Sequence, residues 1–154
     1  MRAMIAQMKL REKLRIGAAV LVAISLIPIP YLASPEWTVT VTDETGHSLP
    51  GMLVRLSYEN YSVENSDHGI DLTTDAGGRV VFPAQKRTAL IMSRCYYTTM
   101  SAMALAHASF GPSAYVLVFG GGREGSVNSS DGSVYFWTGH PDRVTSTIFA
   151  RPKE

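Results

Sequence analysis

The stretch WTVTVTDETGHSLPGMLVRL, residues 37–56, decides the fold of this chain. Its first six residues alternate between apolar and polar side chains, which predicts a strand that buries Trp37, Val39 and Val41 on one face. The segment DETG that follows is rich in turn-forming residues, and a second alternating run covers residues 52–58. Two such strands joined through a turn predict a protein that is mainly β.

Further strand candidates follow at short spacing. Residues 70–74 and 79–82 flank the turn Asp75–Gly78 and predict a hairpin that Pro83 closes. Three later segments are rich in Val, Tyr, Phe and Ile and predict strands: Ala114–Phe119, Ser133–Trp137 and Val144–Phe149. The sequence therefore predicts six or seven strands.

One inserted helix is predicted within residues 88–108. Its apolar stripe recurs at helical spacing and consists of Met92, Tyr96, Met100, Met103 and Ala104. The alternative is a strand over residues 89–93 followed by a loop. We expect the stripe to pack in the core, and we expect Cys95, the single cysteine, to be a small buried side chain. A chain with one cysteine has no internal disulfide.

The amino end predicts export through a membrane. Residues 1–15 carry five basic side chains against one acidic side chain, and residues 16–33 carry no charge. This hydrophobic stretch fits either the apolar region of a signal peptide or, at 18 residues, a transmembrane anchor whose helix ends near Pro28 and Pro30. Tyr31 does not fit the third position before a signal-peptidase cut, which favours a retained anchor over a cleaved peptide that would leave a secreted or periplasmic protein.

The distribution of charge gives this segment an orientation. Because basic flanks stay on the cytoplasmic side, residues 1–15 are predicted to be cytoplasmic, residues 16–33 to lie in the lipid bilayer and residues 34–154 to form an extracytoplasmic domain. In that domain nine Lys and Arg oppose twelve Asp and Glu. A domain near −3 gives no support to nucleic-acid binding.

No motif predicts catalytic, metal-binding or cofactor-binding residues. The densest group of potential ligands is Asp67, His68 and Asp71, in a polar segment where solvated charges are the ordinary outcome. The pattern G-x-G-x-x-G at residues 120–125 is followed by Ser, Asn and Gly rather than by a helix, so it predicts a hairpin connection and no dinucleotide site. Residues 135–137, Tyr-Phe-Trp, are expected to place two of their three aromatic side chains in the core.

The first half of the domain resembles the carboxypeptidase regulatory-like domain. The resemblance rests on residues 37–56 together with DLTTDAGGRVVFP, residues 71–83, and covers residues 37–83 in total. It implies a small immunoglobulin-like or prealbumin-like β-sandwich. Such domains serve as accessory, adhesive or carbohydrate-associated modules, so the resemblance implies a fold more than an activity.

Two functions follow from these observations. The first is a non-enzymatic module, tethered to the membrane, with a binding or structural role at the cell envelope and with an envelope protein or a carbohydrate as partner. The second is a small extracytoplasmic hydrolase with a site built from His68, Asp71, His107 and His140. The second function requires at least two of these histidines to converge in one pocket.

Overall fold

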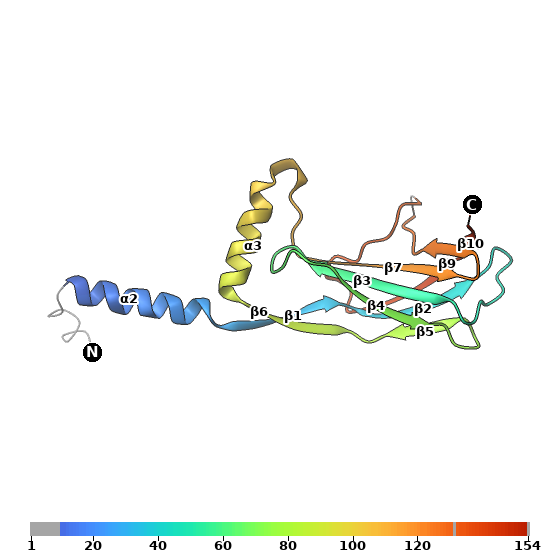
Figure 1. The fold of residues 1–154 in the computed structure, drawn as a ribbon, viewed down its shortest axis with the longest axis horizontal. Helices are drawn as coiled ribbons and strands as arrows, with labels where there is room; N and C mark the ends of the chain where they lie inside the picture. The colour runs from blue at the N-terminus through green and yellow to red at the C-terminus, as the bar shows by residue number, and fades with distance from the viewer. Residues whose placement is uncertain (1–9, 131, 154) are drawn as a thin grey trace.

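The computed structural model describes residues 10–130 and 132–153, and the fold is mainly β with an amino-terminal helix (Figure 1). The elements in chain order are α2 (Leu10–Ser25), β1 (Pro28–Ser34), β2 (Glu36–Thr42), β3 (Leu53–Asn60), β4 (His68–Thr73), β5 (Arg79–Phe82), β6 (Gln85–Leu90), α3 (Ile91–Met103), a 3₁₀ turn (Leu105–His107), β7 (Pro112–Gly120), β8 (Arg123–Ser126), β9 (Arg143–Phe149) and β10 (Arg151–Pro152).

Eight of these strands form two sheets that enclose one hydrophobic core. The larger sheet has the order β10-β8-β7-β3-β4, and the smaller has the order β5-β2-β9. Trp37, Val39 and Val41 on β2 are fully buried, as the alternation predicts, and they share the core with alternate residues of β3 and β7. We call these two sheets the sheet domain.

The predicted hairpin of residues 70–74 and 79–82 is wrong. β4 pairs with β3 in the larger sheet, and β5 pairs with β2 in the smaller one, so the turn between β4 and β5 carries the chain from one sheet to the other. Asp75 shapes this turn because its carboxylate accepts hydrogen bonds from the backbone amides of Gly77 and Arg79. Gly78 follows with a φ of 73°, and a side chain there would meet the carbonyl of Val41 at 2.8 Å.

The predicted strand at Ser133–Trp137 is also wrong, because this segment forms only isolated bridges, between Ala114 and Trp137 and between Asn128 and Val134. Its aromatic side chains nevertheless behave as predicted. Trp137 is fully buried, and its indole nitrogen donates a 2.7 Å hydrogen bond to the carbonyl of Pro141. Tyr135 packs against the core, whereas Phe136 is exposed.

The described residues contain ten strands rather than six or seven. The additional strands are β1, β6, β8 and β10. β7 and β8 form the hairpin predicted for the glycine-rich segment, with Gly121 and Gly122 at positive φ in its turn. α3 confirms the helix predicted within residues 88–108, and the strand that precedes it ends at Leu90 instead of covering residues 89–93.

The hydrophobic stretch of residues 16–33 is divided between a helix and a strand. α2 ends at Ser25, and from Pro28 the chain forms β1, which pairs with β6 in a separate two-stranded sheet. Pro28 and Pro30 cannot continue a helix, since proline lacks the amide proton and its ring clashes with the preceding turn. Within residues 10–130 and 132–153, no helix combines the length and the apolar content that crossing a membrane requires.

Candidate functional site

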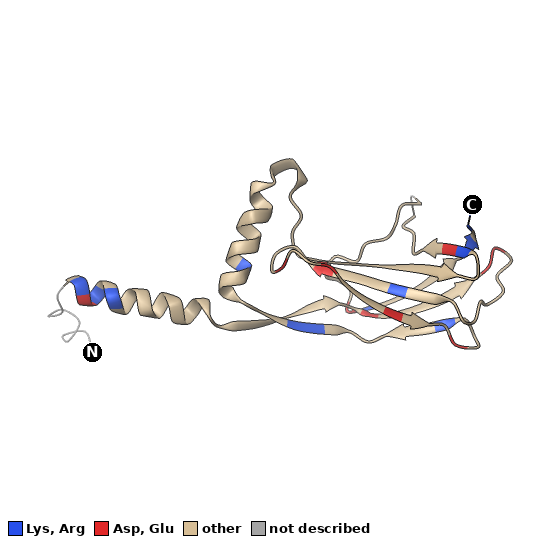
Figure 2. Cartoon of the chain, in the orientation of Figure 1, with Lys and Arg blue, Asp and Glu red and all other residues tan. Residues whose placement is uncertain are grey.

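The most unusual surface of the molecule is that of α2, which buries none of its residues. From Ile16 to Ile24 all its residues are apolar or glycine, and Leu21 is 69% exposed. Its three basic residues, Arg11, Lys13 and Arg15, gather at the outer end of the described helix (Figure 2). A helix that is apolar all round is normally covered by a protein core or by lipid.

The ribbon of β1 and β6 joins α2 to the sheet domain. Six register pairs hold the two strands together, from Pro28 with Leu90 to Ser34 with Gln85. At the far end of β1, Ala33 and Ser34 are completely buried, and Ala33 belongs to the core of the sheet domain. β1 is therefore an integral part of the folded structure.

A polar cluster fixes the ribbon against the loop between β3 and β4. The carboxylate of Glu64 lies 2.9 Å from Nε2 of His68 and 3.6 Å from the guanidinium of Arg87, and it accepts a 3.3 Å hydrogen bond from the hydroxyl of Tyr31. Arg87 also contacts Nε2 of His68. Partial burial and the neighbouring Glu64 carboxylate raise the pKa of Tyr31 above its usual value, so Tyr31 stays a hydrogen-bond donor.

α3 turns one side toward this ribbon and the sheet domain. Ser101 donates a 3.0 Å hydrogen bond to the carbonyl of Tyr61, and Thr98 donates to the carbonyl of Ser62 at 3.5 Å. One turn earlier, Arg94 lies with its guanidinium 5.3 Å from the centre of the Tyr31 ring. Positions 94, 98 and 101 are spaced by four and three residues, so they lie on one face of the helix.

The opposite face of α3 is apolar and exposed, which contradicts the prediction of a core stripe. Its exposed members are Met92, Tyr96, Met100 and Met103, and we call them the α3 stripe. Cys95 beside it is also exposed, so the prediction of a buried thiol is wrong. Helical periodicity identified the stripe correctly, but it gave no information on what would cover it.

The structure places the four residues of the hydrolase hypothesis in separate surroundings. His68 lies in the polar cluster, and Asp71 forms a bidentate ion pair with Arg55 across β3 and β4, with distances of 2.7 and 2.6 Å. His107 is exposed in the 3₁₀ turn after α3, and His140 lies in the loop before β9. Among the described residues no hydrogen bond or ion pair joins any two of these four.

The potential metal ligands of the described residues do not come together at one site either. Within the described part of the chain, no group of three or more His, Cys, Asp or Glu side chains is arranged to hold a metal ion. In the segment that contains Asp67, His68 and Asp71, two of the three side chains have protein partners: His68 pairs with Glu64, and Asp71 with Arg55.

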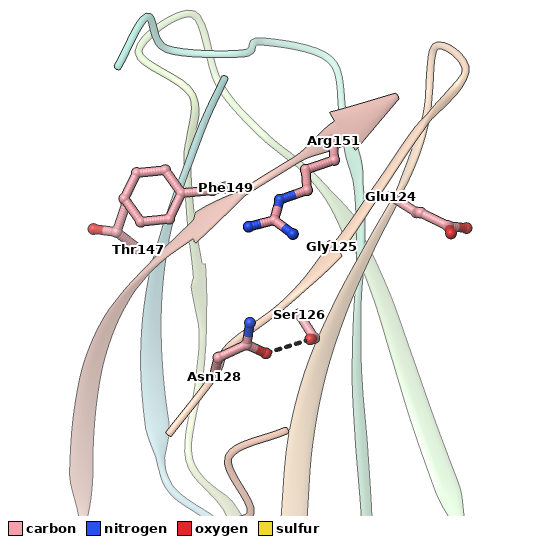
Figure 3. A pocket seen from close by; sticks show the side chains of 7 residues that line it. All are labelled: Glu124, Gly125, Ser126, Asn128, Thr147, Phe149 and Arg151. Atoms are coloured by element: carbon pink, nitrogen blue, oxygen red, sulfur yellow. Dashed lines mark hydrogen bonds between the residues drawn. The ribbon is translucent and has the colours of Figure 1, made fainter. Parts of the chain in front are cut away.

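A pocket of about 280 Å³ opens between the two sheets near the carboxyl end of the chain (Figure 3). It is lined by Glu124, Gly125, Ser126, Asn128, Thr147, Phe149 and Arg151. The Ser126 hydroxyl donates a 2.7 Å hydrogen bond to the Asn128 side chain, while the Glu124 and Arg151 side chains are directed to different sides (Figure 3). β8, β9 and β10 carry this pocket at the end of the molecule remote from α2 (Figure 1).

Gly125 allows the two sheets to approach each other beside this pocket. A Cβ atom at this position would lie 2.8 Å from Cγ2 of Ile148 and 2.9 Å from the carbonyl oxygen of Phe149. Real Cβ atoms do not tolerate such contacts, so only glycine fits here without a shift of β8 or β9. Gly125 is the last glycine of the pattern G-x-G-x-x-G at residues 120–125, for which the sequence predicts a hairpin connection and no dinucleotide site.

Comparison with known proteins adds no further assignment. No family model matches the chain, and no curated protein is similar to it.

Proposed function

We propose that the protein is a membrane-tethered module that α2 anchors in the lipid bilayer and that displays the sheet domain outside the cytoplasm. The exposed apolar surface of α2, with basic residues at its outer end, carries this proposal. The sheet domain then has a binding or structural role at the cell envelope. Its sheets fit a β-sandwich, and the resemblance of residues 37–83 supports the immunoglobulin-like or prealbumin-like type.

Lipid is the environment that suits α2 best. Full burial of a Leu, Ile or Val side chain is favourable by about 1.5–3 kcal/mol, and several such side chains of α2 are exposed. An α-helix satisfies its backbone hydrogen bonds internally, which lipid requires. The 16 residues of α2 extend for about 24 Å at the usual rise per residue, and residues 16–25, which carry no charge, account for about 15 Å of this length.

The basic residues that flank the apolar part of α2 help this short helix to fit a thicker bilayer. A hydrocarbon layer of about 30 Å thins locally around a short apolar helix, and flanking basic side chains extend toward the lipid headgroups. Arg11, Lys13 and Arg15 are placed for this role at one end of α2. By the positive-inside rule these residues face the cytoplasm, so the ribbon and the sheet domain lie on the other side.

The pairing of β1 supports a retained anchor over a cleaved signal peptide. A cut after Ala33 would remove most of β1 and leave β6 without its partner strand. It would also remove a fully buried residue from the core. A retained amino end keeps the pairing of β1 with β6 and keeps Ala33 in the core. With α2 in the membrane, the pocket of Figure 3 lies at the end of the molecule remote from the bilayer, where a carbohydrate or an envelope protein can reach it.

Position 45 gives a direct test of this topology, because Thr45 lies in an exposed turn of the sheet domain and Cys95 is the single cysteine of the chain. In intact cells that express the full chain with Cys95→Ser and Thr45→Cys, a maleimide that cannot cross membranes should label position 45. The matched control with Cys95→Ser alone should remain unlabelled. Labelling that occurs only after lysis would place the sheet domain in the cytoplasm and overturn the proposal.

A fractionation experiment tests the anchor separately. The full chain should remain with the membrane pellet after extraction with alkaline carbonate, whereas Leu21→Asp with Ile24→Asp should move it toward the supernatant. Thr45→Asp, in an exposed turn of the sheet domain, is the control and should not change the distribution. A wild-type chain that carbonate releases completely would show that α2 is not embedded in lipid.

A further inference from the structure

We propose that α3 is a second membrane contact, which lies on the outer surface of the bilayer with the α3 stripe in the lipid. This inference rests on the proposed membrane anchor and goes beyond it, since it assigns a lipid-binding role to a helix of the extracytoplasmic part. The partner is the lipid surface itself, and four observations support this choice.

The first observation is the position of α3. The backbone amide of Ile91, the first residue of α3, donates a 3.2 Å hydrogen bond to the carbonyl of Ile27, just after the end of α2. α3 therefore begins at the level where α2 would leave the bilayer. Figure 1 shows α3 standing across the direction of α2. If α2 is inserted along the membrane normal, α3 lies close to the membrane plane.

The second observation is the direction of the α3 stripe. The side chains of Arg94, Thr98 and Ser101 turn toward β1 and the loop that contains Tyr61 and Ser62. The stripe lies on the opposite side of the helix, because its residues are separated from this polar face by about half a turn. In Figure 1 α3 stands between the sheet domain and α2. The surface of α3 that is turned away from the sheet domain therefore faces the end of the molecule where α2 lies.

The third observation is the chemistry of the surface. Met92, Tyr96 and Met100 are each about half exposed or more, and Met103 is 68% exposed. Beyond α3, Leu105 is 81% exposed and Phe110 is also exposed. Flexible Met side chains adapt to a fluid environment, and Tyr favours the boundary between lipid and water.

The fourth observation is the lack of charge. Over residues 88–122, Arg94 is the single Lys, Arg, Asp or Glu. The stripe has a hollow of about 280 Å³, lined by Met92, Ser93, Tyr96 and Tyr97, and no charged side chain that would fix the orientation of a partner protein. A helix at a membrane interface buries such an apolar side in lipid. The polar side of α3 is bonded to the protein instead of facing water.

The consequence is a fixed orientation of the sheet domain. One helix in the bilayer would leave the domain free to rotate and tilt about the ribbon. A second contact across the direction of the first restricts both motions. The pocket of Figure 3 then points away from the bilayer in a defined direction.

Depth-dependent fluorescence quenching tests the inference on the full chain, reconstituted in vesicles of phosphatidylcholine with a minor share of phosphatidylglycerol. In a Cys95→Ser background, single cysteines are introduced by Leu21→Cys in α2, Met103→Cys and Tyr96→Cys in the stripe, and Thr45→Cys in the turn after β2. Each thiol carries an environment-sensitive dye, and spin-labelled lipids act as quenchers. We expect strong quenching at position 21, quenching near the headgroup level at positions 96 and 103, and none at position 45.

The outcomes separate the two proposals. Quenching at position 21 with none at positions 96 and 103 would overturn the role of α3 while the anchor stands. No quenching at position 21 would overturn the anchor and the inference that rests on it. A dye at position 103 that is shielded from water yet unaffected by the lipid quenchers would show that protein, including a second copy of this chain, covers the stripe, and this result would also overturn the inference.

A charge substitution provides a second measurement. Met100→Asp with Met103→Asp should abolish quenching of a dye at position 96 while the chain stays in the membrane pellet, because α2 is unchanged. Cys95→Asp with Ala102→Asp, on exposed positions about a quarter turn or more from the centre of the stripe, is the matched control for added charge and should retain most of the quenching. Circular dichroism of each variant verifies that the fold is intact. Equal quenching in both pairs would contradict the proposal.

Discussion

The backbone amide of Ile91 and the carbonyl of Ile27 form a 3.2 Å hydrogen bond that joins the start of α3 to the end of α2. These two residues are far apart in the sequence, and the pairing of β1 with β6 brings them together. All apolar helical surface in the described residues is thereby collected at one end of the molecule (Figure 1). The sheets carry their pocket at the other end.

Gly125→Ala should destabilise the sheet domain by about 1–3 kcal/mol, the usual cost of overpacking. The added methyl group would meet Ile148 and the backbone of Phe149 at under 3 Å. Gly69→Ala is the matched control, because Gly69 also lies in a strand and its nearest neighbour, Arg55, is 3.8 Å away. Urea unfolding of both variants measures the difference. Similar midpoints for the two variants would show that β8 can move away from β9 at little cost.

Phe82→Ala should lower the free energy of unfolding by about 3–5 kcal/mol, as is typical for removal of a large buried side chain. Phe82 is completely buried among the residues of β2 and the core. Phe149→Ala removes the same atoms from a side chain that is 58% exposed, so its effect should stay within about 0.5 kcal/mol. A large effect of Phe149→Ala in urea unfolding would mean that this ring is covered in the native protein.

The local structure of the sheet domain could be predicted from the sequence, because side-chain alternation acts over a few residues. The buried face of β2 and the turn shaped by Asp75 are examples. Pairing partners could not be predicted in the same way. β2 pairs in parallel with β9, from Glu36 with Arg143 to Thr42 with Phe149, and no local signal records a contact over such a distance. The predicted hairpin of β4 and β5 failed for the same reason, since neighbours in sequence joined different sheets.

The candidate site illustrates a second limit of the sequence. The spacing of Met92, Tyr96 and Met100 predicts a helix with one apolar face, and this prediction is confirmed. Its burial in the core was wrong, because periodicity does not distinguish a face that packs on protein from a face that remains exposed. The scarcity of charge over residues 88–122 is a signal that could have identified this surface.

Asp71 should titrate below its ordinary pKa of 3.8, because Arg55 donates two hydrogen bonds to its ionised form. Its contribution to stability is therefore complete above the ordinary pKa and is lost as the pH falls through the lower pKa of the folded state. In Arg55→Gln the pKa of Asp71 should rise toward 3.8, as measured by NMR titration of the carboxyl carbon. Asp43, whose pKa is lowered mainly by the hydroxyl of Thr45, is the internal control and should not change. An unchanged pKa of Asp71 in this variant would show that the ion pair does not form in solution.

Removal of residues before Pro28 should leave a stable sheet domain, whereas removal of residues before Ser34 should not. Both truncations lack α2, so they differ only in most of β1. The longer deletion removes the hydrogen-bonded partner of β6, the buried Ala33 and the hydrogen bond that the Tyr31 hydroxyl donates to Glu64. At a net 0.5–1.5 kcal/mol for each lost hydrogen bond, the cost should reach at least about 3 kcal/mol. Urea unfolding compares the two proteins, and hydrogen exchange should show loss of protection in β6 of the shorter one. Equal stability of the two truncations would mean that β1 is dispensable, and the main structural reason to expect an uncleaved amino end would be lost.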